Sequence, residues 1–293
     1  MGESKINILN RIPTTYLPKT IFVEQGTIGK EAILKELKEQ QITYPLIVKP
    51  DIGERGFLVE KIESEVALLA YHKQMPVPYL IQEFISYPIE ISVLYYRLPS
   101  ANSGHITSFC IKETLKVTGD GTSTIESLMA AYPRAILQLH RFRKQFSTLL
   151  AKIPSKGETV ELEPIGNHSR GTTFLNGNHH IDKSLVAVFD TIGFQMKDIY
   201  YGRFDMKCAS IARLKQGTDF KILEFNGIAS EPAHIYQPGY SIFQAYKDLW
   251  QHWKIIYQIS QEQAQKGVAA MSWKDWRLHH QGYKRYLKNA AEN

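Results

Sequence analysis

Charged and polar side chains alternate with apolar ones along two short segments in the last third of the chain. Because successive side chains of a strand point to opposite faces, Asp205 shares a face with Arg203, and Glu224 shares one with Asn226. Pairing of the two strands would bring Asp205, Glu224 and Asn226 to one place. Oxygen ligands of this kind suit a hard cation such as Mg²⁺. The pattern therefore predicts a magnesium site bridging phosphate oxygens, with Arg203 beside it.

The two segments, 202–208 and 220–226, are expected to be strands joined by a hairpin. An edge strand with a solvated acidic face would show the same residues, and for an arbitrary Asp and Glu pair that interpretation is the commoner one. The other motifs, taken in their order along the chain, favour the metal site.

Residues suited to a nucleotide lie in the first third of the chain. Lys49 ends an expected strand, and its ammonium is a flexible point charge that can follow phosphate oxygens. Gly53 and Gly56 lie in the next loop, where glycine lets backbone amides approach an anion. Glu90 can accept two hydrogen bonds from a ribose. A surface lysine, an ordinary hairpin loop and an exposed strand position would account for these residues equally well.

The composition limits the class of protein. With 293 residues and 43% hydrophobic content, the chain can form one large or two modest domains with apolar cores. No apolar run approaches the ~20 residues of a membrane span, and the first residues lack the order of a secretory signal, so a cytoplasmic protein with no membrane partner is expected. The net charge of +6 suits a nucleotide-handling enzyme as well as a nucleic-acid binder. Nucleic acid is not the expected partner.

Helical and strand patterns follow one another without an internal repeat, which predicts an α+β (mixed α/β) protein. Pro76, Pro78 and Pro88 cluster around residue 86, and we expect a boundary between lobes there. The expected domains are a first lobe at 1–85, a second lobe with the metal site at 86–256 and a basic helical extension at 257–293. Strands are expected at 21–23, 46–49, 57–62, 79–85, 89–98 and 105–114, and helices at 30–40, 65–74 and from 123 onward.

Four stretches carry motifs in a characteristic order. They are Tyr44-Pro45-Leu46-Ile47-Val48-Lys49-Pro50 with Gly53-Glu54-Arg55-Gly56, Ile81-Gln82-Glu83-Phe84-Ile85 with Glu90, Val117-Thr118-Gly119-Asp120-Gly121, and Arg203-Phe204-Asp205 with Leu223-Glu224-Phe225-Asn226-Gly227. Together they resemble the ATP-grasp superfamily, and within it the group of D-alanine-D-alanine ligase and cyanophycin synthetase. The resemblance covers roughly residues 5–255. It implies two lobes with mainly antiparallel sheets that clasp ATP between them.

The resemblance also implies a role for each matched residue. Those implied for the nucleotide are Lys49, Gly53, Arg55, Gly56, Gln82, Glu83, Phe84, Ile85 and Glu90, with Lys112 or Lys116 reaching the phosphates from the second lobe. Those implied for catalysis are Arg203, Lys112 and Arg170, and those for the metal are Asp205, Glu224 and Asn226. Candidate substrate residues are His168, Arg170, Ser230, Glu231 and His234. A plain loop histidine, a turn cap and a packing residue are the alternatives for His168, Glu231 and His234.

The implied activity is a carboxylate-amine ligase. ATP would phosphorylate a carboxylate, and an amine would attack the acyl phosphate to give an amide. The implied cofactors are ATP and Mg²⁺, as two ions that Mn²⁺ can replace, and the partners are small-molecule or peptide carboxylates and amines. A phosphotransferase and a nucleotide-responsive binding protein without turnover remain alternatives. Only product analysis separates the ligase from the kinase.

Two departures from the D-alanine ligase pattern concern the substrate. Those ligases begin with a separate domain, whereas here the nucleotide-binding lobe is expected to start almost at once. The segment after the second metal strand, 227–236, also differs from their short Thr, Pro and Gly turn. D-alanine is therefore not the expected substrate. Residues beyond 256, a second copy in a homodimer or a partner protein would have to replace the missing wall.

Overall fold

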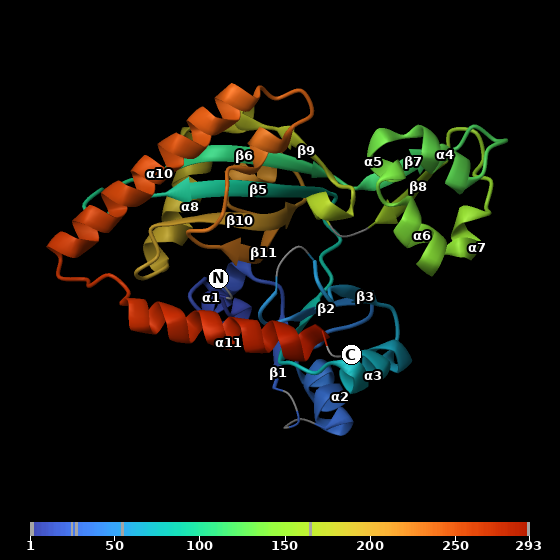
Figure 1. Cartoon of the computed structure of the whole chain (residues 1–293), viewed down its shortest axis with the longest axis horizontal. Helices are drawn as coiled ribbons and strands as arrows, with labels where there is room; N and C mark the ends of the chain where they lie inside the picture. The colour runs from blue at the N-terminus through green and yellow to red at the C-terminus, as the bar shows by residue number, and fades with distance from the viewer. Residues whose placement is uncertain (1–2, 25, 27–28, 54–55, 164–165, 292–293) are drawn as a thin grey trace.

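The computed structural model describes residues 3–24, 26, 29–53, 56–163 and 166–291. Two lobes, each built on an antiparallel sheet, face one another, and a small third unit projects from the second lobe (Figure 1). The expected α+β class with mainly antiparallel sheets is confirmed.

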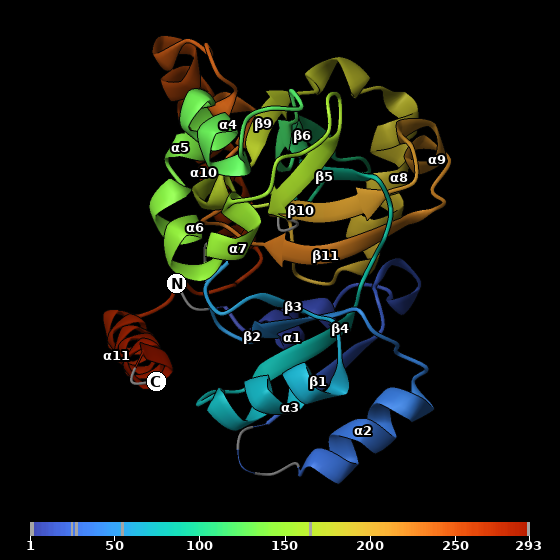
Figure 2. The same cartoon turned by 90° about the vertical axis from the view of Figure 1, so that its right-hand side faces the viewer.

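The first lobe is a four-stranded sheet in the order β1-β4-β2-β3. Its strands are β1 (Thr20–Val23), β2 (Leu46–Pro50), β3 (Glu60–Ile62) and β4 (Tyr79–Glu83), and its helices are α2 (Lys30–Glu39) and α3 (Glu65–Gln74). Both helices lie on the side of the sheet away from the second lobe (Figure 2). Ile33 and Leu37 of α2 and Leu68 of α3 pack there against Val48 and Ile81. This apolar layer leaves the other side of the sheet free to face the cleft.

The second lobe is a five-stranded sheet in the order β11-β10-β5-β6-β9. Its strands are β5 (Ile89–Tyr96), β6 (His105–Glu113), β9 (Thr173–Asn176), β10 (Tyr201–Cys208) and β11 (Phe220–Asn226), and its helices are α8 (Lys183–Gln195) and α9 (Ile211–Lys215). The expected core face of β10 is confirmed, because Phe204, Met206 and Cys208 are buried in the core with Phe189 of α8. Charged side chains of the same strand therefore point to the opposite face.

The projecting unit is inserted between β6 and β9 and has its own small core, which includes Leu115, Met129 and Phe142. Its elements are β7 (Leu115–Thr118), β8 (Thr159–Glu163), α4 (Ile125–Ala131), α5 (Pro133–Ile136), α6 (Leu139–Gln145) and α7 (Ser147–Leu150). The sequence indicated only its first helix. Thr124 caps that helix by accepting a hydrogen bond from the Ser127 amide.

The two ends of the chain tie the lobes together. The terminal helices are α1 (Lys5–Leu9), α10 (Ile242–Gln265) and α11 (Trp273–Ala291), and the short 3-10 turns are η1 (Thr14–Tyr16), η2 (His168–Arg170), η3 (Asn178–His180) and η4 (Ala233–Tyr236). Helix α1 packs Leu9 into the core of the second lobe, while its Lys5 amide donates to the Asp51 carbonyl of the first lobe. Residue 256 lies inside α10, and α11 returns to the first lobe, where Ala290 joins the core.

Two expected elements differ in detail from the structure. The strand expected at 57–62 is reduced to β3 because Leu58 has a φ of 53°, in the left-handed region, where a strand cannot continue. The connection expected to be a simple hairpin loop contains α9 between β10 and β11, whose antiparallel pairing is as expected.

Tyr286 of α11 joins the last helix to the loop after β2. Its hydroxyl accepts a hydrogen bond from the Ile52 amide at 3.2 Å and donates one to the Pro78 carbonyl at 3.3 Å. We expect Tyr286→Phe to lower the free energy of unfolding by about 1–2 kcal/mol, because a part-buried amide loses its acceptor. Urea unfolding at unchanged m-value measures the loss. Tyr257→Phe, on an exposed side chain, is the control and should match the parent.

Candidate functional site

A cavity of about 710 Å³ lies between the two lobes. Strands β2 and β4 line it from the first lobe, and β5, β6, β10 and β11 line it from the second. The loop 166–169 and the segment 227–231 close its sides. The polar face of the second-lobe sheet therefore meets the open face of the first-lobe sheet at one shared cavity.

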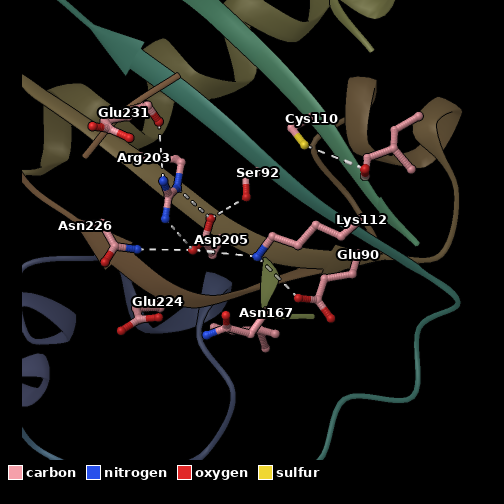
Figure 3. A network of polar contacts seen from close by, with 12 residues as sticks. Glu90, Ser92, Cys110, Lys112, Asn167, Arg203, Asp205, Glu224, Asn226 and Glu231 are labelled. Atoms are coloured by element: carbon pink, nitrogen blue, oxygen red, sulfur yellow. Dashed lines mark hydrogen bonds and ion pairs between the residues drawn. The ribbon is translucent and has the colours of Figure 1, made fainter. Parts of the chain in front are cut away.

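The buried carboxylate of Asp205 is the centre of the polar face (Figure 3). It accepts hydrogen bonds from Ser92 Oγ at 2.5 Å, from Arg203 Nε at 3.1 Å and Nη2 at 3.2 Å, and from Asn226 Nδ2 at 3.1 Å. The Lys112 ammonium lies 3.6 Å away. Four strands contribute to this cluster, because Asp205 is paired in register with Ser92 on one side and with the residues of β11 on the other.

The charges of the cluster stabilise one another. Burial acts to raise the pKa of Asp205, but Arg203 and Lys112 outweigh it and lower that pKa from 3.8 to about 2. Burial likewise acts to lower the pKa of Lys112, and Asp205 and Glu90 outweigh it, so that pKa is raised. Asp205 is thus an anion, and Lys112 a cation, across the physiological range.

Glu224 lies opposite Asp205 on β11 and keeps a third of its side chain exposed to the cavity. The Lys5 ammonium is 3.6 Å from its carboxylate and also donates to the Gly53 carbonyl at 2.8 Å. A cation thus already stands between Glu224 and the loop after β2.

The donor set fits a hard cation only in part. Asp205, Glu224 and the Asn226 amide supply oxygen ligands of the type that Mg²⁺ prefers, and the exposed side of Glu224 is open to one. Asp205 is enclosed by donors, so it would have to exchange its Asn226 contact for the metal. Within the described ranges, no group of three or more His, Cys, Asp or Glu side chains is placed to hold a metal ion. Phosphate oxygens would have to complete the coordination.

Lys49 reaches across the cavity from β2. Its ammonium donates to Gln82 Oε1 at 3.0 Å and to the Leu223 carbonyl at 2.8 Å, which joins the two lobes. Burial lowers the pKa of Lys49 from 10.5 to about 8, even though Glu224 acts to raise it. Both hydrogen-bond acceptors of this ammonium are uncharged, so an anion that enters the cavity would form a stronger interaction with it.

Glu90 and Phe84 line the other end of the cavity. Glu90 is paired with Lys112 at 3.3 Å. Gly166 crosses so close to the Glu90 carboxylate that a Cβ at that position would overlap it. The Phe84 ring lies beneath the Lys61 ammonium at 4.8 Å and the Lys207 ammonium at 5.2 Å. The Glu90 carboxylate and the Phe84 ring thus line the cavity, as expected of residues that would contact a ribose and a base.

The segment after β11 closes the end of the cavity beyond Arg203. The Arg203 guanidinium donates to the Glu231 carbonyl at 3.3 Å, and the Tyr236 hydroxyl donates to the Glu231 carboxylate. Ser230 Oγ donates to the Gly227 carbonyl at 2.6 Å. Ser230, Glu231 and Tyr236 thus line the cavity on the side of Arg203.

Most of the residues that the sequence singled out line this one cavity. They are Lys49, Gly53, Gly56, Gln82, Glu83, Phe84, Ile85, Glu90, Lys112, His168, Arg203, Asp205, Glu224, Asn226, Ser230 and Glu231. Lys112, and not Lys116, is the lysine that reaches it, because Lys116 is exposed on β7 in the projecting unit. Arg55 lies outside the described residues.

Two substrate candidates lie elsewhere. His234 is buried and hydrogen-bonds Ser108 Oγ through Nδ1 at 2.8 Å, so it packs under the segment and does not face the cavity. Arg170 lies behind the loop 166–169, where its guanidinium donates to the Gly56 carbonyl at 2.5 Å and pairs with buried Glu163 at 3.7 Å. Arg170 thus joins the two lobes, and it is not among the residues that line the cavity.

Sequence reasoning missed several cavity residues, among them Glu3, Lys5 and Phe174. Lys5 is the most consequential, because its ammonium contacts Glu224 and the loop after β2. Nothing in the spacing around Lys5 signals this position, which arises only when α1 packs against β11. The expected replacement of a missing wall by residues beyond 256 is not what the structure has: the N-terminal residues line the cavity, and α11 covers the first lobe.

The chain is similar in structure to several solved enzymes. One is D-alanine-D-alanine ligase from Bacillus anthracis (TM-score 0.45, 14% identity, covering 89% of this chain and 67% of that one). Others are the D-Ala:D-Ser ligase from Enterococcus faecalis (0.43, 14%, 80% and 56%) and the bifunctional glutathione synthetase from Pasteurella multocida (0.41, 12%, 79% and 33%). The chain spans only a third of the glutathione synthetase and about half of the D-Ala:D-Ser ligase. No protein-family model and no curated protein sequence matches the chain.

The lowered pKa of Asp205 predicts how stability depends on pH. A carboxyl whose folded pKa is about 2, below its ordinary 3.8, contributes stability above pH ~4 that is lost as the pH falls through about 2. The shift corresponds to about 2 kcal/mol. We expect metal-free parent protein to lose about this much more free energy of unfolding than Asp205→Asn does as the pH is lowered from about 5 toward 2. Denaturant unfolding at each pH measures it, and equal slopes for the two proteins would contradict the assignment.

Proposed function

We propose that this chain is an ATP-dependent carboxylate-amine ligase that forms an amide or peptide bond through an acyl phosphate. The observation that carries the proposal is the convergence, in one cavity between two sheets, of a carboxylate pair and the cations Lys5, Lys49 and Arg203. A polyphosphate needs that balance of charge: cations for its oxygens, and carboxylates for the metal that accompanies it.

The nucleotide would lie along β4 and between the lobes. Lys49 would bind the phosphates, and Gly53 and Gly56 in the loop after β2 would let backbone amides approach them. The backbone at Phe84 and Ile85 would meet the base, and Glu90 would accept the ribose hydroxyls. Lys5 would give up Glu224 and turn to the terminal phosphate.

Asp205, Glu224 and Asn226 would hold Mg²⁺, which neutralises phosphate charge when bound. The reaction itself would take place beside Arg203. A carboxylate oxygen of the substrate attacks the terminal phosphorus, the bond to ADP breaks, and an acyl phosphate forms. The amine nitrogen then attacks the acyl carbon, phosphate leaves, and Glu231 would be the base that accepts the amine proton. Arg203 would stabilise the oxyanion that develops in this second step.

Glu231 also suits selection of the amine. An ammonium entering a cavity lined by Lys49 and Arg203 is repelled, and a carboxylate at its entry offsets that repulsion. Ser230 and His168 line the same region and would contact the substrate. Amino acids and short peptides, which carry both reacting groups, are therefore the substrate class to test first.

A phosphotransferase would use the same nucleotide-binding residues, and its product distinguishes it from a ligase. Carboxylate labelled with ¹⁸O delivers the label to inorganic phosphate when an acyl phosphate is attacked by an amine. A kinase retains the phosphoryl group on its product. Release of labelled phosphate together with an amide supports the ligase, and a stable phosphorylated product identifies the kinase.

Charge removal at the carboxylate pair tests the proposed metal site. We expect Glu224→Gln and Asp205→Asn to lower Mg²⁺-dependent ADP release more than ~100-fold, because each weakens a metal clamp that supplies several kcal/mol to the transition state. Glu63→Gln, on an exposed side chain of the first lobe, is the matched control. Folding is checked by circular dichroism. Parent-like turnover in both folded variants would refute the site.

The pKa of Lys49 predicts how ATP affinity depends on pH. Its ammonium has a pKa of about 8, and phosphate binding favours the charged form. Raising the pH from about 7 to about 9 should therefore weaken ATP binding by up to about tenfold. Lys49→Met should bind ATP weakly at either pH and show little of this dependence. Calorimetry measures the ATP affinity of the parent and of the variant at each pH. A parent affinity that does not change with pH would contradict the assignment of Lys49 to the phosphates.

A further inference from the structure

Helix α10 carries five exposed aromatic side chains in a single stripe. Phe243, Tyr246, Trp250, Trp253 and Tyr257 follow one another at alternating spacings of three and four residues, which places them on one side of the helix. Each is between 57 and 85% exposed. A contiguous row of exposed apolar side chains on the surface of a protein marks an interaction site.

The other side of α10 is firmly attached to the second lobe. His252 is buried and hydrogen-bonds the Tyr201 hydroxyl at 3.0 Å, and Asp248 accepts a hydrogen bond from the Tyr240 hydroxyl at 2.6 Å. Glu262, one turn from the end, accepts the Ser100 amide at 2.9 Å. The aromatic stripe is therefore held outward by the fold and cannot be buried by a rotation of the helix.

The charge next to the stripe is positive. Lys247 and Lys254 lie beside it and are exposed. The two carboxylates of α10, Asp248 and Glu262, are hydrogen-bonded on the attached side. An anionic surface would thus meet aromatic rings and two lysines together.

Helix α11 begins with the same combination. Trp273 and Trp276 are exposed, and Lys274 and Arg277 lie between and beside them. Figures 1 and 2 place α10 and α11 along one side of the molecule. All four tryptophans of the chain lie on these two helices. We call the stripe of α10 together with the start of α11 the aromatic-basic face.

We propose that the aromatic-basic face binds reversibly to the surface of a bilayer that contains anionic lipids, with α10 lying in the plane of the headgroups. Tryptophan and tyrosine favour the boundary between headgroups and acyl chains, and lysines beside them are attracted to anionic lipid. This inference does not rest on the proposed function. The expectation of no membrane partner rested on spanning segments, and among the described residues no helix is long and apolar enough to span a membrane.

A second copy of the chain fits the face less well. Pairing of two helices at this spacing is built on aliphatic residues, whereas the stripe is aromatic throughout. An antiparallel pairing of α10 with itself would bring Lys247 and Lys254 of the two copies together, and like charges oppose such contact. Charge complementarity therefore favours an anionic surface.

Vesicle binding tests the proposal with the intact protein. Because all four tryptophans lie on the face, their fluorescence should shift to shorter wavelength when phosphatidylcholine-phosphatidylglycerol vesicles are added, and much less with phosphatidylcholine alone. Trp250→Ala with Trp253→Ala should weaken vesicle binding more than about tenfold, because the protein loses two aromatic side chains that would be buried in the bilayer surface. Gln195→Ala with Gln216→Ala, on exposed side chains at the ends of α8 and α9, is the control and should bind like the parent.

The charge is tested separately and keeps the proposal falsifiable if the tryptophan variant fails to fold. Lys247→Gln and Lys254→Gln should each weaken vesicle binding about fivefold, and added salt should weaken binding of the parent. Lys35→Gln on α2 is the control for loss of a distant charge. Absence of binding by the parent, or equal binding to neutral and anionic vesicles, would overturn the proposal. So would a dimer, seen by light scattering without lipid, that Trp250→Ala with Trp253→Ala converts to a monomer.

Discussion

The buried charge of Asp205 sets the constraint on which the second lobe depends. An isolated carboxylate in this position would be very costly, and only close, well-aligned donors make it tolerable. Ser92, Arg203, Lys112 and Asn226 supply them from four adjacent strands. A shift of one residue in any of these strands would turn its donor to the opposite face. The charge balance of the cavity therefore depends on the register of the sheet.

The same polar face is joined to the first lobe by contacts that cross the cavity. Lys49 donates to the Leu223 carbonyl next to Glu224, Lys5 bridges Glu224 and the Gly53 carbonyl, and Arg170 donates to the Gly56 carbonyl. Two of these contacts end on the loop after β2, which the proposed function assigns to the phosphates. An entering polyanion would compete for the cations that hold the lobes together. Ligand binding and the relative position of the lobes should therefore be linked.

The C-terminal helices show how one segment can serve the fold and remain available for binding. The attached side of α10 carries His252 and Asp248 in hydrogen bonds to the second lobe, while α11 places Tyr286 and Ala290 on the first. These anchors leave the aromatic stripe outside. The helices thus contact both lobes, and neither is among the described elements that line the cavity, whereas Glu3 and Lys5 are.

The sequence by itself determined the antiparallel α+β class, nearly all the strands of the two sheets and the placement of Asp205, Glu224, Asn226 and Arg203 on one face, because alternation along a strand is a local property. Local motifs also singled out Lys49 and Glu90, which line the cavity. Only the tertiary structure decided between Lys112 and Lys116, buried His234 away from the cavity, made Arg170 a link between the lobes and brought Lys5 to Glu224. These outcomes depend on contacts between residues far apart in the chain, and the packing of α1, the projecting unit and η4 has no periodic signal in the sequence.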